Sequence, residues 1–424
     1  MMRLRHVVYT MAVLLAVAGG AFSFPSVRTA LGCDWKSVTE SAVPADKAST
    51  AAAGEDNLTA EQRREKKLDG AVREKLASMT DEEKVAQLFI ITPEALVDGV
   101  STVTAAGSAT KEALDRTPVG GFIYMGGNLR NPGQTRTMLK NVAAYGRERS
   151  GVPLFLCVDE EGGTVARIGN AGTFGVPLTG DMAAVGGSSD TVRARQAGVT
   201  IGSYLADLGF NVDFAPDADV LTNPQNTVVR RRAFGSDPQL VTAMAREVAE
   251  GLRSKGLLYS YKHFPGHGNT AGDTHDGFAY TERTREELER CELLPFQDAV
   301  ANRAPFIMVG HISCPAVIGD NTPASLSPAI MTGLLRQDMG YEGLIITDAL
   351  NMGAIVNLYS SSQAAVKAFL AGTDILLMPA DFRGAYAGML AAVRDGTISR
   401  ERLDASVGRI LRTKLRYLSP GEIK

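Results

Sequence analysis

One pattern recurs along the chain from about residue 85. A short apolar run, often bounded by glycines, is followed by a segment whose apolar residues have helical spacing. The runs are continuous rather than alternating, which is typical of parallel strands covered on both faces by helices. The eight apolar runs occupy residues 85–92, 119–127, 153–159, 210–220, 256–263, 305–311, 343–348 and 373–378. Helical spacing is clearest in residues 135–149, 191–208, 238–255, 285–301 and 329–339.

Repeated strand–helix units of this kind predict an α/β fold. Eight units over about 340 residues favour a single closed (β/α)8 barrel of the TIM type over an open, doubly wound sheet. We therefore expect one catalytic barrel over residues 69–424. Active sites of such barrels lie at the C-terminal ends of the strands. Polar residues follow or end five of the predicted strands, at 159–161, 213–219, 262–263, 311 and 348. A single polar strand end is often a helix cap, but five together indicate a site.

The chain begins with the pattern of an export signal. Basic Arg3 and Arg5 precede the run 7–24, which is nearly all apolar or small and is close to the minimum length of a spanning helix. Cys33 follows a short segment that resembles a lipoprotein processing site. Residues 1–33 are therefore a signal peptide or a lipoprotein signal or anchor. Lipidation at Cys33, an uncleaved anchor, and ordinary cleavage with secretion stay open. Each places the barrel outside the cytoplasm, secreted or membrane-anchored.

Residues 34–68 differ from both neighbours. They contain few bulky apolar residues and many Ala, Ser, Thr and charged residues, a composition that cannot bury enough surface to fold alone. We expect a flexible linker. Helical character appears near its end, with Thr59 as a candidate N-cap.

Composition excludes several classes of partner. Of the 424 residues, 45% are hydrophobic and 21% charged, as in an ordinary soluble globular protein. The net charge is −3, whereas proteins that bind nucleic acids usually carry an excess of positive charge, so we expect no nucleic-acid partner. The four cysteines have no metal-ligand spacing, no glycine-rich phosphate motif has the required context, and the acidic group at 213–219 lacks EF-hand periodicity. We predict neither a metal nor another cofactor.

Candidate chemistry is densest in residues 262–275, which hold three of the chain's five histidines. Glycines and a proline stop any helix there and predict an irregular loop. Asp273 and His275 are two residues apart, and a carboxylate beside an imidazole raises its basicity, as proton transfer requires. An isolated Asp-X-His is more often part of a polar surface loop. Lys262 and His263, at the end of a predicted strand, favour a site.

These residues also carry a resemblance. KHFPGHG at 262–268 followed by DTH at 273–275 resembles the signature of glycoside hydrolase family 3, in its bacterial β-N-acetylhexosaminidase branch, and the similarity extends over about residues 76–417. It implies a retaining exo-β-N-acetylglucosaminidase that hydrolyses terminal non-reducing β-GlcNAc from cell-wall-derived or related glycans through a covalent glycosyl-aspartate. A GlcNAc phosphorylase of the same fold and a non-catalytic sugar-binding surface lipoprotein are the alternatives. The oligomeric state stays open.

The resemblance assigns the catalytic residues. Asp348 ends the apolar run 343–348, and the letters TDAL around it resemble the family's nucleophile motif. The residues alone are equally consistent with an Asp that caps the following helix. His275 is implied as the acid/base, oriented by Asp273. In retaining enzymes the two catalytic groups lie roughly 5–5.5 Å apart.

Substrate contacts are implied residue by residue. The matching positions are Asp159, Arg167, Arg232, Lys262 and His263. The chain also departs from the pattern. Thr164 stands where many members have an arginine, Asn269 replaces the common Asp of KHFPGHGD, and residues 278–279 replace a frequent Leu-Pro. We expect the two loop changes to affect loop order and not the type of reaction.

Overall fold

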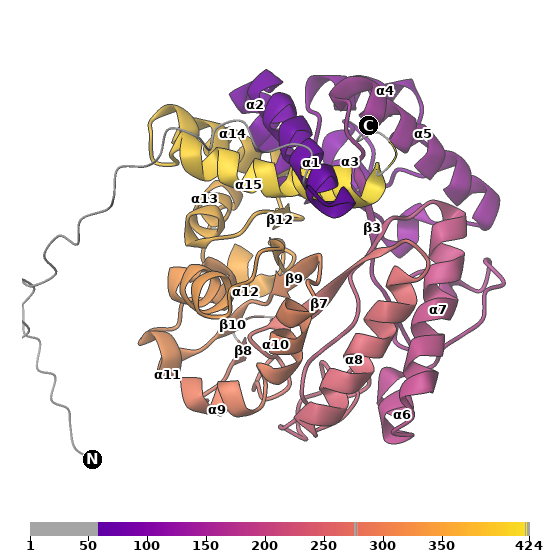
Figure 1. Ribbon diagram of the computed structural model, residues 1–424, viewed down its shortest axis with the longest axis vertical. Helices are drawn as coiled ribbons and strands as arrows, with labels where there is room; N and C mark the ends of the chain where they lie inside the picture. Colours follow the sequence, from indigo (N-terminus) through magenta and orange to yellow (C-terminus); the bar gives the residue numbers. More distant parts are fainter. Residues whose placement is uncertain (1–57, 275–276, 278, 420, 422–424) are drawn as a thin grey trace, which may run out of the picture. The chain divides into compact units, whose positions relative to one another are not determined.

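The computed structural model describes residues 58–274, 277, 279–419 and 421 (Figure 1). The expected signal or anchor at 1–33 and most of the expected linker lie outside these residues, as does His275. Residues from Leu58 onward form one compact unit. In the described part of the chain, none of the helices has the length and hydropathy needed to span a bilayer.

Eight parallel strands form a nearly closed barrel. Their order is β11-β9-β7-β6-β3-β2-β1-β12, and a parallel bridge between Ile346 and Ile375 links the two ends of this order. The strands are β1 (Phe89–Ile91), β2 (Gly121–Ile123), β3 (Phe155–Val158), β6 (Val212–Asp213), β7 (Leu258–Phe264), β9 (Phe306–Val309), β11 (Leu344–Thr347) and β12 (Leu376–Leu377). Each overlaps one predicted apolar run, so the prediction of an eight-stranded α/β barrel is confirmed.

The strands are shorter than the apolar runs. In the first run, Val85 belongs to helix α2 (Asp81–Gln87) and not to β1. The cause is a capping box, in which Thr80 accepts from the backbone of Glu83 and the Glu83 carboxylate accepts from the backbone of Thr80. Reciprocal capping of this kind starts a helix. The residues at the end of α2 are buried against the barrel. In the sequence they continue almost directly into β1, so the apolar run is longer than the strand.

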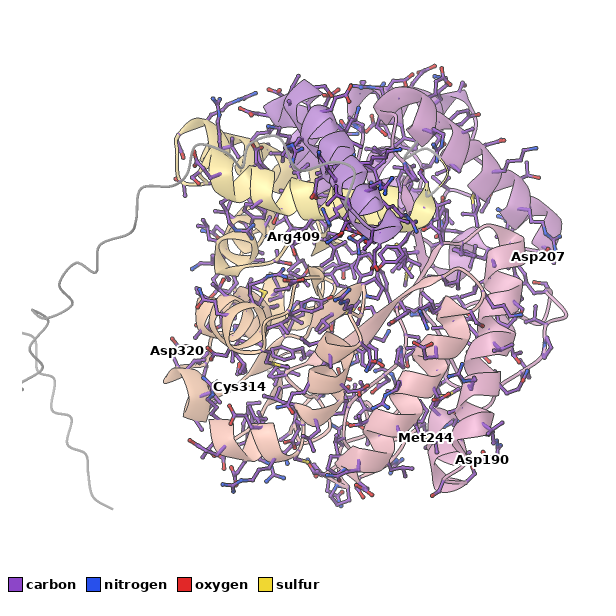
Figure 2. All side chains as sticks on the ribbon, viewed as in Figure 1. Asp190, Asp207, Met244, Cys314, Asp320 and Arg409 are labelled. Atoms are coloured by element: carbon purple, nitrogen blue, oxygen red, sulfur yellow. The ribbon has the colours of Figure 1, made fainter. Side chains whose placement is uncertain are left out.

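The helices surround the strands (Figure 1). Helix α7 (Thr191–Leu208) has the predicted bounds, with Asp190 accepting from the first-turn backbone and Gly209 ending the helix at a φ of 101°. Figure 2 labels Asp190 and Asp207 at its two ends. The other long helices are α5 (Pro132–Ser150), α8 (Pro238–Arg253), α13 (Ser361–Ala371), α14 (Phe382–Arg394) and α15 (Arg400–Thr413).

Two predicted helices differ from expectation. The range 285–301 is two helices, α9 (Arg285–Arg290) and α10 (Leu294–Ala301), because Cys291 leaves helical geometry with φ −135° and ψ −84°. Proline at the second position of α10 suits a new helix start. The predicted helix 329–339 is the π-helix η4 (Ala329–Asp338). Helical spacing is compatible with both outcomes, so the sequence pattern did not distinguish them.

Helix α1 (Ala60–Ser78) begins inside the range 34–68 that we expected to be a linker. Thr59 is its N-cap, as predicted, and forms a capping box with Gln62. Leu68 is buried, and Arg412 of α15 pairs with Glu65 and Asp69 of α1. This packing extends the folded unit toward the N-terminus. It could not be predicted from the amino-acid composition of residues 34–68.

Shorter elements complete the described chain. They are α3 (Pro93–Leu96), α4 (Ser108–Arg116), η1 (Gly126–Asn128), β4 (Glu160–Gly162), β5 (Val165–Ala166), η2 (Gly169–Ala171), α6 (Met182–Gly187), β8 (Ala279–Tyr280), β10 (Ile312–Ser313), α11 (Pro315–Ile318), η3 (Ala324–Leu326), α12 (Gly353–Val356) and η5 (Lys414–Leu418). Of these, the antiparallel pair β4–β5 and the parallel pair β8–β10 follow barrel strands and build the rim that holds the site.

The barrel interior is apolar and aromatic. Phe155 and Phe306 meet edge to face, with ring centroids 5.3 Å apart. The buried Lys414 lies with Nζ 4.8 Å from the Phe155 ring centre and donates to Gln87 Oε1 and Gly120 O, each at 2.8 Å. Burial lowers the pKa of Lys414 to about 7.

Candidate active site

The predicted polar strand ends meet at one rim of the barrel. Asp159 follows β3, Lys262 and His263 lie near the end of β7, and Asp348 follows β11. Parallel neighbouring strands place their C-terminal ends on the same side, which brings together residues far apart in the chain.

Lys262 lies at the centre of a buried charge cluster. Its Nζ is 3.0 Å from Asp159 Oδ1 and 2.7 Å from Glu161 Oε1. Burial alone would lower the pKa of Lys262, but Asp159 and Glu161 raise it above its ordinary value. Lys262 is therefore an ammonium ion with three N–H donors, two of them directed at carboxylates.

Arg232 reaches the same cluster from the segment between β6 and α8. Its Nε donates to Glu161 Oε2 at 2.8 Å and its Nη2 to Glu161 Oε1 at 2.7 Å. Burial would raise the pKa of Glu161, but Arg232 and Lys262 lower it. Glu161 thus holds both cations in place. We did not assign it from the sequence, although it lies two residues after Asp159, a spacing that puts both side chains on one face of an extended segment.

His263 is held in one tautomer. Its Nε2 is 3.2 Å from Arg232 Nη2, and because a guanidinium only donates, Nε2 accepts. The proton is therefore on Nδ1, which donates to Asp219 Oδ2 at 2.7 Å. Burial would raise the pKa of Asp219, but His263 and His267 lower it to about 2. Asp219, like Glu161, is a residue of the site that was not predicted from the sequence.

Three of these groups resemble a metal site. Ligand atoms of Asp217, Asp219 and His263 lie within 4.8 Å of one another. Their atoms, however, already bond to protein groups. Asp217 Oδ1 accepts from the Asp219 backbone at 3.0 Å, and Asp217 Oδ2 is 3.3 Å from Arg232 Nε. Hydrogen bonds and one ion pair therefore engage these groups, although Asp217 Oδ2 has no hydrogen-bond partner in the described structure. The expectation that no metal is needed stays a prediction.

Asp348 is fixed by its own backbone. Its N–H donates to Val309 O at 2.9 Å, and its Oδ1 accepts from Ala349 N at 2.8 Å. Burial would raise the pKa of Asp348, but His263 and His311, together with that backbone hydrogen bond, lower it. The next helix, α12, has Met352 as its N-cap, so Asp348 does not cap a helix. The geometry leaves an ionised carboxylate at the rim.

His311, which lies between β9 and β10, contacts the residue after Asp348. Its Nε2 lies 2.9 Å from Ala349 O, and its Nδ1 lies 2.6 Å from Ser325 Oγ. Because a carbonyl only accepts, Nε2 carries a proton and donates to it. In the sequence, His311 stands out only as a polar residue after a predicted strand, with no predicted role.

The loop that carries Asp273 reaches the same rim. Ala271 and Tyr280 exchange two backbone hydrogen bonds of 3.1 Å, which closes the neck of the loop. Inside it, Thr274 O accepts from Ala354 N at 3.2 Å, and Ala354 belongs to the helix that follows Asp348. The predicted acid/base His275 lies outside the described residues, so the geometry of the Asp273–His275 pair is not described.

Arg167 is the remaining predicted contact. Its Nη2 lies 3.7 Å from Asp159 Oδ2, so the structure brings it to the cluster through a long ion pair. With Arg167, the structure brings all five predicted substrate-binding residues into one cluster, in which Glu161 joins Arg232 to Lys262. The five are Asp159, Arg167, Arg232, Lys262 and His263.

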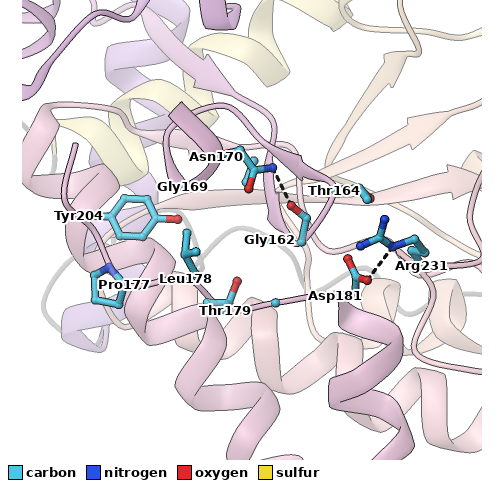
Figure 3. A pocket seen from close by; sticks show the side chains of 13 residues that line it. Gly162, Thr164, Gly169, Asn170, Pro177, Leu178, Thr179, Asp181, Tyr204 and Arg231 are labelled. Carbon is cyan, nitrogen blue, oxygen red and sulfur yellow. Dashed lines mark hydrogen bonds and ion pairs between the residues drawn. The ribbon is translucent and has the colours of Figure 1, made fainter. Parts of the chain in front are cut away.

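A pocket of about 420 Å³ lies beside this cluster, along the β4–β5 hairpin (Figure 3). It is lined by glycines 162, 163 and 169 and by Leu178, Tyr204 and Arg231, among others, and none of the described residues of the charge cluster lines it. Tyr204 donates to the buried Glu160 at 2.8 Å. Successive residues of an extended strand face opposite ways. Glu160 accordingly contacts Tyr204 while Glu161 contacts Lys262.

Comparison with known proteins places the chain in a family. Residues 80–413 match the family described as "Glycosyl hydrolase family 3 N terminal domain". The chain is 34% identical to beta-hexosaminidase A of Pseudoalteromonas piscicida over 342 residues, covering 74% of this chain and 56% of that relative. It is 32% identical to beta-hexosaminidase LpqI of Mycobacterium tuberculosis, covering 80% of this chain and 84% of the relative.

A solved structure agrees with the sequence matches. A glycoside hydrolase family 3 beta-N-acetylglucosaminidase from Paenibacillus sp. superposes with a TM-score of 0.75 at 36% identity, covering 80% of this chain and 63% of that one. The chain thus spans little more than half of the first of these relatives and about two thirds of this structure. With the barrel and rim described above, these matches show that the chain belongs to glycosyl hydrolase family 3.

Proposed function

We propose that this protein is a retaining exo-β-N-acetylglucosaminidase that removes terminal non-reducing β-GlcNAc from cell-wall-derived or related glycans. The observation that carries the proposal is Asp348, an ionised carboxylate at the end of β11. It is close enough to the ammonium group of Lys262 for that charge to lower its pKa. The names of the similar proteins, beta-hexosaminidase and beta-N-acetylglucosaminidase, support the substrate class.

The reaction proceeds in two displacements. Asp348 attacks the anomeric carbon, the bond to the leaving oxygen breaks, and His275 donates a proton to that oxygen. A glycosyl ester of Asp348 results. Water then attacks the same carbon while His275 takes up its proton, and the ester bond breaks to regenerate the Asp348 carboxylate. Asp273 orients the imidazole and stabilises its protonated form.

The charge cluster holds the sugar. The third N–H of Lys262 and the carboxylate of Asp159 are suited to sugar hydroxyls, and charge-assisted hydrogen bonds of this kind are the stronger ones. Glu161 and Asp219 do not need to touch the sugar. They keep Lys262, Arg232 and His263 in position before it binds, so little ordering is left to be done on binding.

The decisive test uses an Asp348→Gly variant with an activated aryl β-GlcNAc. The variant should lose turnover, and added azide should restore aglycone release by taking the place of the missing carboxylate. Because azide then attacks in a single displacement, the product should be the α-glycosyl azide. Normal turnover without azide, or a β-azide product, would exclude Asp348 as the nucleophile.

A second measurement tests whether water or inorganic phosphate accepts the glycosyl group. The wild-type enzyme should release free GlcNAc at the same rate with and without inorganic phosphate. If phosphate instead yields GlcNAc 1-phosphate as the main product, the chain is a phosphorylase. If the protein binds GlcNAc oligosaccharides but cleaves none, it is a sugar-binding protein.

We also propose that residues 1–33 direct export and that the protein acts outside the cytoplasm, secreted or held at a membrane. The support is the basic, apolar and Cys33 pattern of the sequence. Mass spectrometry of the mature N-terminus in the native host decides among the outcomes. A lipid-modified Cys33, an intact Met1 and an unmodified cleavage product each correspond to one of them.

A further inference from the structure

Asn269 bridges the two ends of the loop that carries Asp273. Its Nδ2 donates to Thr222 Oγ1 at 3.0 Å, and its Oδ1 accepts from Thr281 Oγ1 at 2.8 Å. Thr222 lies after β6, and Thr281 directly follows β8, where the loop returns to the barrel. The amide therefore links the outgoing part of the loop both to the barrel rim and to the returning part.

The direction of each hydrogen bond in this bridge is determined by its neighbours. Thr222 donates its single hydroxyl proton to Glu292 Oε1 at 3.2 Å. Thr222 Oγ1 can therefore only accept from residue 269, so residue 269 must offer an N–H there. At the other side Thr281 Oγ1 accepts from Arg283 N at 3.3 Å and gives its proton to Asn269. An amide supplies one donor and one acceptor, and it satisfies both threonines.

Glu292 is what makes a carboxylate unsuitable at position 269. It is fully buried at the break between α9 and α10, and Arg283 Nε lies 3.6 Å from its Oε1. Burial raises the pKa of Glu292, while Arg283 and Thr222 oppose that rise. An Asp at 269 would leave Thr222 with one proton for two acceptors and would bring a second carboxylate to the same hydroxyl. One acceptor would then be unpaired in a buried place, which is costly.

Beside the backbone pair of Ala271 and Tyr280, two other side chains hold only the outgoing part of the loop. Asn226 Nδ2 donates to His267 O at 2.8 Å, and Asn223 Nδ2 donates to Thr270 O at 3.0 Å. Both contacts hold the outgoing part of the loop and do not reach the returning part at Thr281. Asn269 contacts both parts, so a change there acts on the spacing of the two ends between which Asp273 lies.

We propose that Asn269 is a positioning residue for the acid/base loop, matched to the buried Glu292. The proposal rests on the proposed function, because it assigns the consequence of the contact to proton transfer by the loop. It also accounts for the departure from the usual Asp of the KHFPGHGD pattern. In this chain the buried acceptor at 292 requires a donor at 269.

The test is a double-mutant cycle with two substrates. Asn269→Asp, Glu292→Gln and the combined variant are assayed with an aryl β-GlcNAc that has a good leaving group and with one that has a poor leaving group. Asn269→Asp should reduce kcat by about tenfold on the substrate with the poor leaving group and by much less on the other substrate. The reason is that only the poor leaving group needs a proton from the acid/base residue in order to depart. Glu292→Gln alone should be nearly silent, since its amide oxygen can still accept from Thr222.

The combined variant should recover to within about threefold of the wild type. There the amide introduced at position 292 donates to Thr222, whose proton now goes to the carboxylate introduced at 269. Both hydrogen bonds of Thr222 are then reversed and satisfied, while Thr281 donates to position 269 as before. Asn321→Asp, at an exposed position, controls for the added charge. Thr281→Val breaks the bridge at its other side without a charge, and it should show the same dependence on the leaving group even if Asn269→Asp does not fold.

Several results would overturn the proposal. One is wild-type kinetics in Asn269→Asp, another is no recovery in the combined variant, and a third is an equal loss on both substrates accompanied by a lower Tm. If the wild-type protein cleaves neither substrate, the proposed function fails as well. The same cycle followed by thermal unfolding still decides whether positions 269 and 292 are coupled.

Discussion

Lys262 and Glu161 form a buried ion pair, with Nζ and Oε1 2.7 Å apart and the two side chains 3% and 1% exposed. Glu161 also binds Arg232 through two hydrogen bonds. One carboxylate therefore holds two cations at the mouth of the barrel. Removing one partner of such a pair is more damaging than a surface substitution, because it leaves charges buried without compensation.

Glu161→Gln should therefore impair both stability and substrate binding. We expect a loss of roughly 3 kcal/mol in the free energy of unfolding and a fall of about 100-fold in kcat/KM. Urea unfolding and kinetics on an aryl β-GlcNAc measure the two effects. The control is Glu247→Gln, which removes the partner of the half-exposed Arg195 and should cost at most about 1 kcal/mol. If both variants behave alike, Glu161 does not organise the site.

Replacing His311 should change the pH dependence of the reaction. His311 lowers the pKa of Asp348, and Asp348, as the proposed nucleophile, must be ionised to attack. A neutral His311→Leu substitution should raise the pKa of Asp348, so the acidic limb of kcat/KM against pH should move to higher pH. Loss of the hydrogen bond to Ala349 should also lower kcat by about tenfold or more. Ser325→Ala keeps the imidazole and should leave the acidic limb nearly unchanged. An unmoved limb in His311→Leu would contradict the assignment.

Lys414 predicts a pH dependence of stability. Its pKa is about 7 in the folded protein, below the ordinary value of 10.5, because burial disfavours the ammonium form. Above pH 10.5 the amine is neutral in both states and carries no penalty. As the pH falls toward 7, the unfolded chain binds a proton that the folded protein does not, so stability decreases, and the full penalty is present below pH 7.

The measurement is urea unfolding of wild type and Lys414→Met at pH 7, 8 and 9. The variant leaves Gln87 Oε1 and Gly120 O without their donor, so its stability at one pH is not diagnostic. The difference between the two proteins is diagnostic. As the pH rises from 7 to 9, the free energy of unfolding of the wild type should increase relative to that of the variant, with a slope that approaches about 1.4 kcal/mol per pH unit. A constant difference would mean that Lys414 stays charged, as its contact with the Phe155 ring favours.

The contact between α7 and α8 predicts a sensitive glycine. A Cβ on Gly198 would lie 2.2 Å from Val248 O, a distance that no packing tolerates. Gly198→Ala should push the helices apart and cost about 1–3 kcal/mol, or several degrees in Tm. Gly408, in α15, has open space within 4 Å of the place that a Cβ would occupy, so Gly408→Ala should raise stability by about 0.5–1 kcal/mol through helix propensity. Calorimetry of the two variants compares them directly, and loss in both would contradict the packing argument.

The sequence by itself determined the features that depend on neighbouring residues. Apolar runs with no alternation predicted all eight barrel strands, and the pattern from Asp190 to Gly209 predicted the bounds of α7, because capping and helical periodicity are local. The strand ends and the family motif also selected five residues that the structure places at one rim, and their role in binding sugar stays a prediction. The role of His275 was implied by the resemblance alone and stays a prediction.

Only the tertiary structure decided which charges meet. Glu161 pairs with Lys262 about 100 residues away, and Asp219 holds His263, because strands β3, β6 and β7 are neighbours in the barrel. The break at Cys291, which buries Glu292 under the loop, and the bridge made by Asn269 are decided in the same way. The direction of a hydrogen bond depends on which donors and acceptors the fold brings into contact. These contacts cannot be predicted from the spacing of residues along the chain.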